Sequence, residues 1–367
     1  SSFRDLDGKI SADSIYNPSP LNQDVSFWHR TAEVPRTTKN TTRTTHFDAA
    51  LEGWFDVGRH EYNWDVGVNW NKSSGLQLRQ GNVNLLHASA AIGPSFIDAN
   101  GTPRCGTPGN MIEGCIPWNV LGAGDPDKLT PELRDYLFVT GQDSYGSKVV
   151  SYTANITGGL FDMPHGGEVA FAAGAEHRTM SGYENPDQFS QSGLSTDLSS
   201  GPTKGQFQVN EAYGELSIPV LQGVTGAEEL TFDLASRYSR YSNFGSTTNS
   251  KFGFAWRPIA DLLVRGNFSE SFRAPSIDNL FGGTSETFDS FTDPCDASFG
   301  AGIYGQTVHQ ACVATLQVPD PENFHQLDPS GLPVTGPDTQ TAHPFLSGSN
   351  PNLDPETAKT RTLGVVY

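Results

Sequence analysis

The chain has 367 residues, more than one ordinary domain needs, and it starts at Ser1 without a signal peptide, so we expect an internal piece of a longer protein. Its formal net charge of −18 excludes nucleic acid as a partner, because binding to a phosphate backbone requires a basic stripe. No apolar run reaches the roughly eighteen residues of a membrane-spanning helix, which leaves alternating strands as the only route across a bilayer.

Seven segments of the chain alternate apolar and polar residues with the two-residue period of a β-strand. These segments are Phe47–Phe55, Tyr62–Trp70, Val150–Leu160, Val169–Ala175, Leu230–Tyr238, Phe252–Trp256 and Leu262–Phe268. In each of them the apolar phase carries no Asp, Glu, Lys or Arg. A lipid-facing barrel wall and the core of a soluble β-sandwich both produce this sorting, so alternation alone leaves both architectures open.

One further segment departs from the pattern. Phe207 and Val209 lie on one phase, whereas Leu216 lies on the other. A β-bulge near Asn210 or Glu211 would bring the two groups to one face, and we predict one there.

Tight turns and long loops alternate between the segments. The tight connections are Val57–His60, Asp162–Gly167, Leu221–Ala227 and Pro258–Asp261, and the long ones are Ser73–Ser144, Gly182–Lys204 and Arg273–Lys359. The connection Asn243–Ser246 is short, but because successive connections alternate between the two ends of the sheet, it falls at the same end as the long loops. In an antiparallel up-and-down sheet all tight turns then gather at one rim, as in outer-membrane barrels. We therefore predict an all-β chain that is a fragment of a large antiparallel transmembrane β-barrel.

The four cysteines form two close pairs, Cys105 with Cys115 and Cys295 with Cys312, and both pairs lie inside long loops. This spacing predicts two local disulfides and an oxidising compartment, and it differs from the CxxC spacing of a structural zinc site. In the first long loop, Thr130 followed by a proline predicts a short helix with Thr130 as its N-cap.

Two motifs resemble signatures of TonB-dependent receptor barrels. The residues SESFRAPSIDNLF at 269–281 are similar to the SxxFRAPxxxxLF signature, and NPNLDPETAKTRTLG at 350–364 is similar to the NPxLxPExxxxxxxG signature. The stretch KGQFQVNEAYGELSI at 204–218 also resembles a recurrent barrel strand of these receptors. The signature residues are Phe272, Arg273, Ala274, Pro275, Asn350, Pro351, Leu353, Pro355 and Glu356.

The resemblance covers the chain from Thr41 to the end and implies a closed barrel of twenty-two strands, of which about nine lie in this chain. It predicts an extracellular loop region at 1–40, barrel strands with long extracellular loops at 41–272, a long extracellular loop at 273–358 and the start of a further strand at 359–367. It also implies the outer membrane of a Gram-negative bacterium, a plug domain inside the barrel, and a short N-terminal box that contacts the TonB–ExbB–ExbD complex. Neither the plug nor the box lies in these 367 residues.

The implied activity is active uptake of a scarce nutrient, such as an iron-siderophore, cobalamin or an oligosaccharide, without enzymatic turnover or a cofactor. Two alternatives stay open. A passive porin needs no plug and lacks both signatures. A secreted β-rich carbohydrate-binding protein or hydrolase would pack the apolar phases into a soluble core and would not need detergent for extraction.

No catalytic constellation stands out, because the histidines are scattered and neither an HExxH motif nor a nucleophile elbow is present. Acidic clusters at Asp125–Asp127 and Asp293–Asp296 lack an EF-hand pattern, so solvated turns are favoured over calcium sites. The signature prolines fix turns, and Arg273 is expected to pair with a carboxylate, which favours structural roles over cargo contact.

Six residues are candidates for contact with the cargo, although packing or ion pairing is favoured for each of them. Loop aromatics can stack on a ring of the cargo, and arginines on the polar phase of the strands can line its route. The candidates are Trp118, Tyr183, Tyr304, Arg178, Arg237 and Arg265. The acid-rich loops favour a neutral or cationic cargo over an anionic one.

Overall fold

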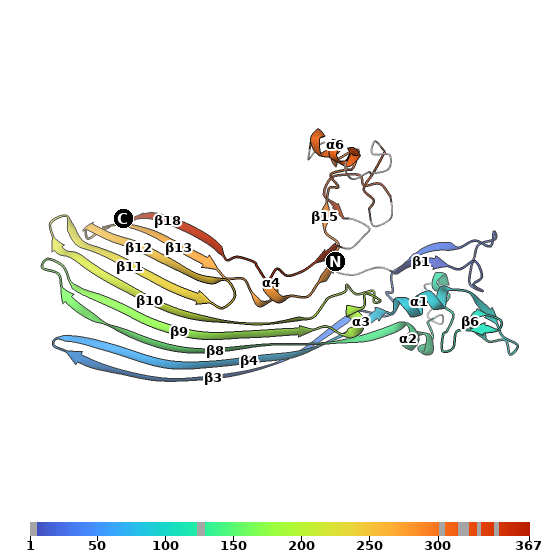
Figure 1. The fold of residues 1–367 in the computed structure, drawn as a ribbon, viewed down its shortest axis with the longest axis horizontal. Helices are drawn as coiled ribbons and strands as arrows, with labels where there is room; N and C mark the ends of the chain where they lie inside the picture. Colours follow the sequence, from blue (N-terminus) through green and yellow to red (C-terminus); the bar gives the residue numbers. More distant parts are fainter. Residues whose placement is uncertain (1–5, 123–128, 301–304, 315–322, 329–331, 341–344) are drawn as a thin grey trace.

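The computed structural model describes residues 6–122, 129–300, 305–314, 323–328, 332–340 and 345–367. Its largest element is a nine-stranded antiparallel sheet with the spatial order β18-β13-β12-β11-β10-β9-β8-β4-β3 (Figure 1). The strands are β3 (Thr37–Val57), β4 (His60–Val83), β8 (Phe138–Asp162), β9 (Glu168–Asn185), β10 (Thr203–Val224), β11 (Ala227–Tyr241), β12 (Gly245–Ile259), β13 (Leu262–Arg273) and β18 (Glu356–Val366). The predicted all-β class and the large antiparallel sheet are confirmed, and the total of twenty-two strands stays a prediction.

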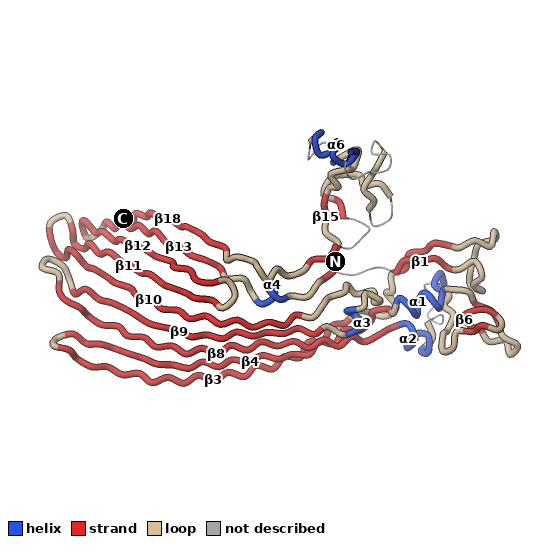
Figure 2. The backbone as a smooth tube through the Cα atoms, viewed as in Figure 1, coloured by secondary structure: helices blue, strands red, loops and turns tan. Residues whose placement is uncertain are grey.

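The connections are sorted by length between the two ends of the sheet. The four short turns that follow β3, β8, β10 and β12 lie together at the left in Figure 2, and the connections longer than these lie at the right. Residues 84–137, 186–202 and 274–355 form the three long connections at that second end, which we call the loop end. The first end is the turn end. This is the arrangement that the alternation of tight and long connections predicted.

One face of the sheet is apolar across all nine strands. The pairing register places the apolar phases of neighbouring strands side by side, because paired residues point to the same face. One such row reads Phe171, Leu216, Leu234, Phe252 and Phe268. We call this surface the apolar face and its reverse the polar face. Leu51 on the apolar face is 69% exposed, so within the described residues this surface is not buried as a sandwich core would be.

The predicted bulge near Asn210 or Glu211 is wrong. The pairing of β10 with β9 and β11 continues without a shift through both residues, and the register shift of β10 lies between Pro219 and Leu221 instead. Phe207 and Val209 therefore lie on the polar face, where they pack in a small apolar cluster with residues of the connection after β13. These two apolar residues lie on the polar face because they pack against the connection after β13, and β10 needs no bulge to place them there.

The first long connection folds together with the segment before β3 into a compact loop module (Figure 1). Its elements are β1 (Leu6–Ile10), β2 (Val25–His29), α1 (Leu85–Ile92), β5 (Ser95–Ile97), β6 (Pro103–Thr107), β7 (Asn110–Met111), η1 (Val120–Gly122) and α2 (Pro131–Leu137). The buried core joins Ile10 and Phe27 from the first segment to Ile92 and Leu137 from the second. Two stretches separated in the sequence by β3 and β4 thus form one hydrophobic unit.

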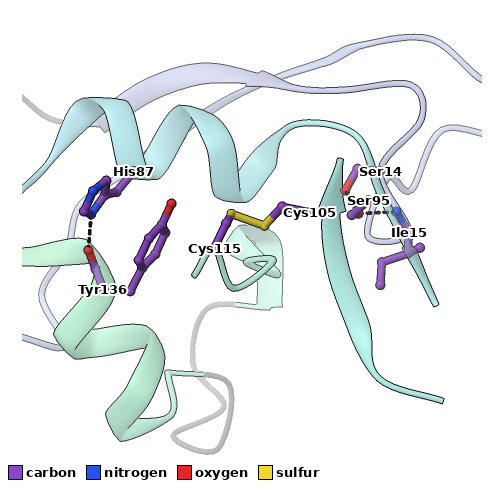
Figure 3. The surroundings of a disulfide bond; sticks show 7 residues. All are labelled: Ser14, Ile15, His87, Ser95, Cys105, Cys115 and Tyr136. Atoms are coloured by element: carbon purple, nitrogen blue, oxygen red, sulfur yellow. Dashed lines mark hydrogen bonds between the residues drawn. A yellow bond between two sulfur atoms is a disulfide. The ribbon is translucent and has the colours of Figure 1, made fainter. Parts of the chain in front are cut away.

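The predicted disulfide between Cys105 and Cys115 lies in this core, with 5.8 Å between the two Cα atoms (Figure 3). Next to it, the rings of His87 and Tyr136 stack at a centroid distance of 4.3 Å and join α1 to α2. The helix predicted at Thr130 is confirmed as α2. Thr130 is its N-cap, and the Thr130 hydroxyl accepts a hydrogen bond from the backbone N–H of Leu133 at 3.2 Å.

The remaining connections carry short elements only. They are α3 (Gln188–Gln191), α4 (Ile277–Phe281), β14 (Ser285–Thr287), β15 (Ser290–Phe291), α6 (Gln306–Ala314), β16 (Thr339–Gln340) and β17 (Phe345–Ser347). The second predicted disulfide, Cys295 to Cys312, has a Cα separation of 5.6 Å. No helix in the described part of the chain combines the length and the apolar character needed to cross a membrane.

Candidate functional site

A group of charged side chains on the polar face centres on Glu211 of β10. The Glu211 side chain is 5% exposed and accepts a hydrogen bond from the Ser239 hydroxyl of β11. Its Oε2 lies 3.4 Å from Nη1 of Arg237 and 3.6 Å from Nη2 of Arg178. Arg178 also donates to Glu176 at 3.0 Å. Two carboxylates and two guanidinium groups thus balance each other, which stabilises a buried carboxylate that would be costly if unpaired.

Neutral polar side chains extend this group across the sheet. The Arg237 guanidinium lies 5.0 Å from the ring centroid of Tyr213, within the range of a cation–π contact. The Tyr213 hydroxyl donates to Asn155 at 2.9 Å, and the Asn155 amide donates to Asp65 at 2.8 Å. Together with Glu176, Arg178, Glu211 and Ser239, these residues form what we call the polar-face network, which spans β4, β8, β9, β10 and β11.

The structure brings together two of the three arginines proposed as cargo contacts. Arg178 and Arg237 share Glu211, whereas Arg265 lies on β13, paired in register with Ala255 and Gly364, outside the network. The sequence pattern did not single out Glu211, since the expected bulge left its face undefined. If β10 is read as a continuous strand, Glu211 shares its phase with Val209, and both then lie on the polar face.

The three aromatic candidates have separate positions. Trp118 is 5% exposed in the core of the loop module, where its ring meets His29 edge-on at 5.5 Å, so little of its surface is left for a cargo. Tyr183 pairs with Lys204 and Gly146 on the apolar face, which points away from the polar-face network. Tyr304 lies outside the described residues, as do Asp125–Asp127 of the first acidic cluster.

The first signature folds back onto the polar face of the sheet. Phe272, Ala274 and Ile277 pack against Phe207 and Tyr241, and Phe272 meets the Tyr241 ring edge-on at 5.8 Å. Pro275 is buried and precedes α4, where Ser276 and Asn279 form a reciprocal capping box. Leu280 is 2% exposed. These contacts give the signature a packing role, and the ordered turn that results covers the loop end of β9 and β10.

The second signature contacts the first. The Asn350 backbone N–H donates to the Asn279 carbonyl at 3.0 Å, and the Leu353 N–H donates to the Asn350 carbonyl at 3.1 Å, which closes the turn that contains Pro351. At the start of β18, Glu356, which follows Pro355, accepts two hydrogen bonds from Arg273, one of them from Nε at 3.0 Å. The carboxylate partner expected for Arg273 therefore comes from the second signature. A polar cleft of about 390 Å³ lies between the two signatures.

In the second acidic cluster, hydrogen bonding explains the position of Asp296. Its carboxylate accepts backbone hydrogen bonds from Ser298 at 2.8 Å, Phe299 at 2.8 Å and Gln326 at 2.7 Å. Burial alone would raise its pKa, but the three backbone donors together with nearby His325 hold the pKa below its usual value of 3.8. The carboxylate thus organises the backbone of the loop. Within the described residues no group of three or more His, Cys, Asp or Glu side chains is arranged to hold a metal ion.

Comparison with known proteins gave one family and one similar structure. The family described as "TonB dependent receptor-like, beta-barrel" matches residues 2–367. The comparison with curated proteins found no match. The crystal structure of the siderophore receptor PirA from Acinetobacter baumannii is similar over 89% of this chain and 41% of that chain, with 11% sequence identity and a TM-score of 0.36. The chain therefore spans less than half of that receptor. Because the family match covers nearly every residue, the chain belongs to the TonB-dependent receptor β-barrel family.

Proposed function

We propose that this chain is part of the barrel wall of a receptor that takes up a scarce nutrient across the outer membrane, with energy supplied through TonB, ExbB and ExbD. The observation that carries the proposal is the division of the sheet into an apolar face nine strands wide and a reverse face with the polar-face network. A bilayer on one side and a hydrated interior on the other would produce this division. The family membership supports the coupling to TonB.

The cargo that fits this wall best is neutral or cationic. Between Asp48 and Asp65 the polar phases of β3 and β4 carry Asp48, Glu52, Asp56, Glu61 and Asp65 and no Lys or Arg. On β9 and β11, Arg178 and Arg237 are already engaged by Glu176 and Glu211. On β3, β4, β9 and β11 an anionic cargo would therefore meet carboxylates and neutralised arginines, an unfavourable environment for negative charge.

Uptake by cells that produce the full-length receptor tests both parts of the proposal. We expect a radiolabelled neutral or cationic ferric siderophore to accumulate, and an anionic one to accumulate less. Accumulation should stop in an otherwise identical strain without TonB, because the family's transport is active. Accumulation that persists without TonB would identify a passive channel. A strict preference for the anionic compound would overturn the assignment of cargo charge and leave the uptake function standing.

A further inference from the structure

Trp54 of β3 points to the polar face of the sheet, unlike the strand tryptophans Trp64, Trp70 and Trp256, which point to the apolar face. It is the register partner of Asn63, lies three residues before the end of β3 at the turn end, and is 67% exposed. β3 forms one edge of the nine-stranded sheet (Figure 1). Because side chains stand roughly perpendicular to a sheet, a further strand beside β3 would flank the ring and leave its outer side open.

The other aromatic side chains on the polar face of the nine strands each contact a neighbour. Phe207 and Tyr241 pack under the first signature and are 5% and 8% exposed. The Tyr213 ring lies against a guanidinium group, and the Tyr145 hydroxyl lies 2.7 Å from a threonine hydroxyl of β3. Among the described residues no aromatic or cationic group contacts the Trp54 ring in this way. A large apolar surface is thus left uncovered on the face that is otherwise polar.

Four carboxylates surround Trp54. Glu52 and Asp56 lie two residues before and after it on the same face of β3, and Glu61 and Asp65 lie two residues on either side of its register partner. Among the described residues no hydrogen bond or ion pair engages the carboxylate of Glu52 or Asp56. The open face of the indole therefore lies in a field of uncompensated negative charge.

A hollow of about 690 Å³ lies beside the tryptophan ring. It is bordered by Glu52, Asn63 and Asp65 and, on β8, by Asn155 and Thr157. Sites for small molecules have volumes of about 300–1,000 Å³, so the hollow is large enough for part of a cargo. Asn155 donates to Asp65 at 2.8 Å, so the hollow adjoins the polar-face network, whose members keep this border in place.

The combination of an indole with carboxylates selects one class of ligand. A cation over the face of a tryptophan is attracted by the ring, and carboxylates at the side of the ring add to that attraction. An anionic group would be repelled, and a neutral ring would gain nothing from the carboxylates. A metal ion would require several ligands around one point, and no group of three or more His, Cys, Asp or Glu side chains in the described part of the chain is arranged to hold one.

We propose that Trp54, flanked by Glu52 and Asp56, binds an organic cationic group of the cargo, a guanidinium or an alkylated ammonium, in the barrel interior near the turn end. The inference rests on the proposed function, because it requires the polar face to line the route of the cargo. Charge complementarity and the size of the hollow favour a group of the cargo over a single side chain of the plug. Short turns face the periplasm in bacterial barrels, so this site lies late on the route.

The test uses the full-length receptor in a non-ionic detergent, with 5-fluorotryptophan in place of tryptophan, and follows the fluorine NMR signals. Trp54→Phe and Trp28→Phe identify the signals of these two residues. Trp28 on β2 of the loop module is the matched control, because it is 61% exposed and lies outside the polar face. We expect tetramethylammonium chloride to shift the Trp54 signal with saturation, whereas the Trp28 signal does not shift and sodium chloride at the same concentration moves neither signal.

The carboxylates are tested in the same titration. Glu52→Gln combined with Asp56→Asn should weaken the binding of tetramethylammonium about 5-fold, which corresponds to about 1 kcal/mol for two exposed ion pairs. Glu132→Gln combined with Asp135→Asn removes the same charge from exposed positions on α2 and should leave the binding unchanged. If the double variant on β3 does not fold, Glu52→Gln alone provides the comparison.

A Trp54 signal that does not respond to tetramethylammonium would overturn the inference, whether a plug side chain fills the hollow or no cation binds there. Equal weakening by the two double variants would overturn it as well. Dependence of uptake on TonB is measured separately in cells. If that dependence persists while the Trp54 signal stays silent, the cation site is wrong and the proposed function stands; uptake without TonB would instead contradict the proposed function.

Discussion

Replacement of Gly205 by alanine tests the packing of the first signature on the polar face. A Cβ atom at this position would lie 2.1 Å from Cδ2 and 2.6 Å from Cγ of Phe281, well inside van der Waals contact. The ring must therefore move, yet it belongs to α4, which is held by the buried Leu280 and by the hydrogen bond between the Asn279 carbonyl and the Asn350 N–H. Overpacking of this kind costs about 1–3 kcal/mol.

Gly214→Ala on the same strand is the matched control, because a Cβ there has no atom within 4 Å. Both substitutions reduce the conformational freedom of the unfolded chain equally, by roughly 0.4–1 kcal/mol, so the difference between them isolates the clash. The opening free energy of α4 is measured by hydrogen exchange of the Leu280 and Gly282 amides, which donate to Ser276 and Asp278. A loss of about 1–3 kcal/mol accelerates exchange roughly 5- to 150-fold.

Equal exchange in the two alanine variants would refute the contact. A second arm adds Phe281→Ala. If the ring is the obstacle, its removal relieves the effect of Gly205→Ala, and the double variant loses less than the sum of the single variants. Additive losses would mean that Gly205 acts on α4 by some route other than the Phe281 ring.

Three further perturbations test other parts of the molecule. Glu211→Ala leaves two guanidinium groups without their shared carboxylate and should lower the free energy of unfolding by about 2–3 kcal/mol in denaturant titrations, whereas the exposed Glu215→Ala should change it little. Replacement of Cys105 and Cys115 by serine should destabilise the loop module by about 3 kcal/mol, seen as faster exchange in α1; unchanged exchange would argue against a stabilising role. The pKa of Asp296 is lower in the folded state than its ordinary 3.8, so its stabilising contribution is present above about pH 4 and is lost as the pH falls through the folded-state pKa. Asp296→Asn should flatten that acid dependence in thermal unfolding, and an unchanged profile would count against the backbone hydrogen bonds.

The strands were predictable because each has one face that excludes charge. Alternation in Tyr62–Trp70 or Phe252–Trp256 defines strand and face together, and the lengths of the connections define the ends of the sheet. The same rule failed at Phe207 and Val209, where apolar residues serve a contact with Ile277 on the polar face. A two-residue period cannot distinguish that case from a bulge.

The candidate site was only partly predictable for a related reason. Arg178 and Arg237 were selected for their phase, but the carboxylate that joins them lies on the strand between theirs. Only the register shows that the three side chains meet. Trp118 demonstrates the opposite error, because residue type suggested a binding aromatic and the fold places the ring in a core assembled from two distant segments. Neither segment shows a regular alternation of apolar and polar residues that would predict that packing.

The register of the sheet also determines how the strands lean. The uninterrupted apolar run toward the loop end stops at Phe47 on β3 and at Phe268 on β13, where Glu270 is the next residue of that phase, but the chain of register partners leads from Phe268 to Phe55. The border of the apolar face toward the loop end is therefore displaced by eight residues, about 26 Å along the strands, over seven inter-strand steps, about 34 Å across the sheet. For that border to lie level in a flat bilayer, the strands must incline by about 40° from the membrane normal, within the range of about 35–45° for transmembrane barrels.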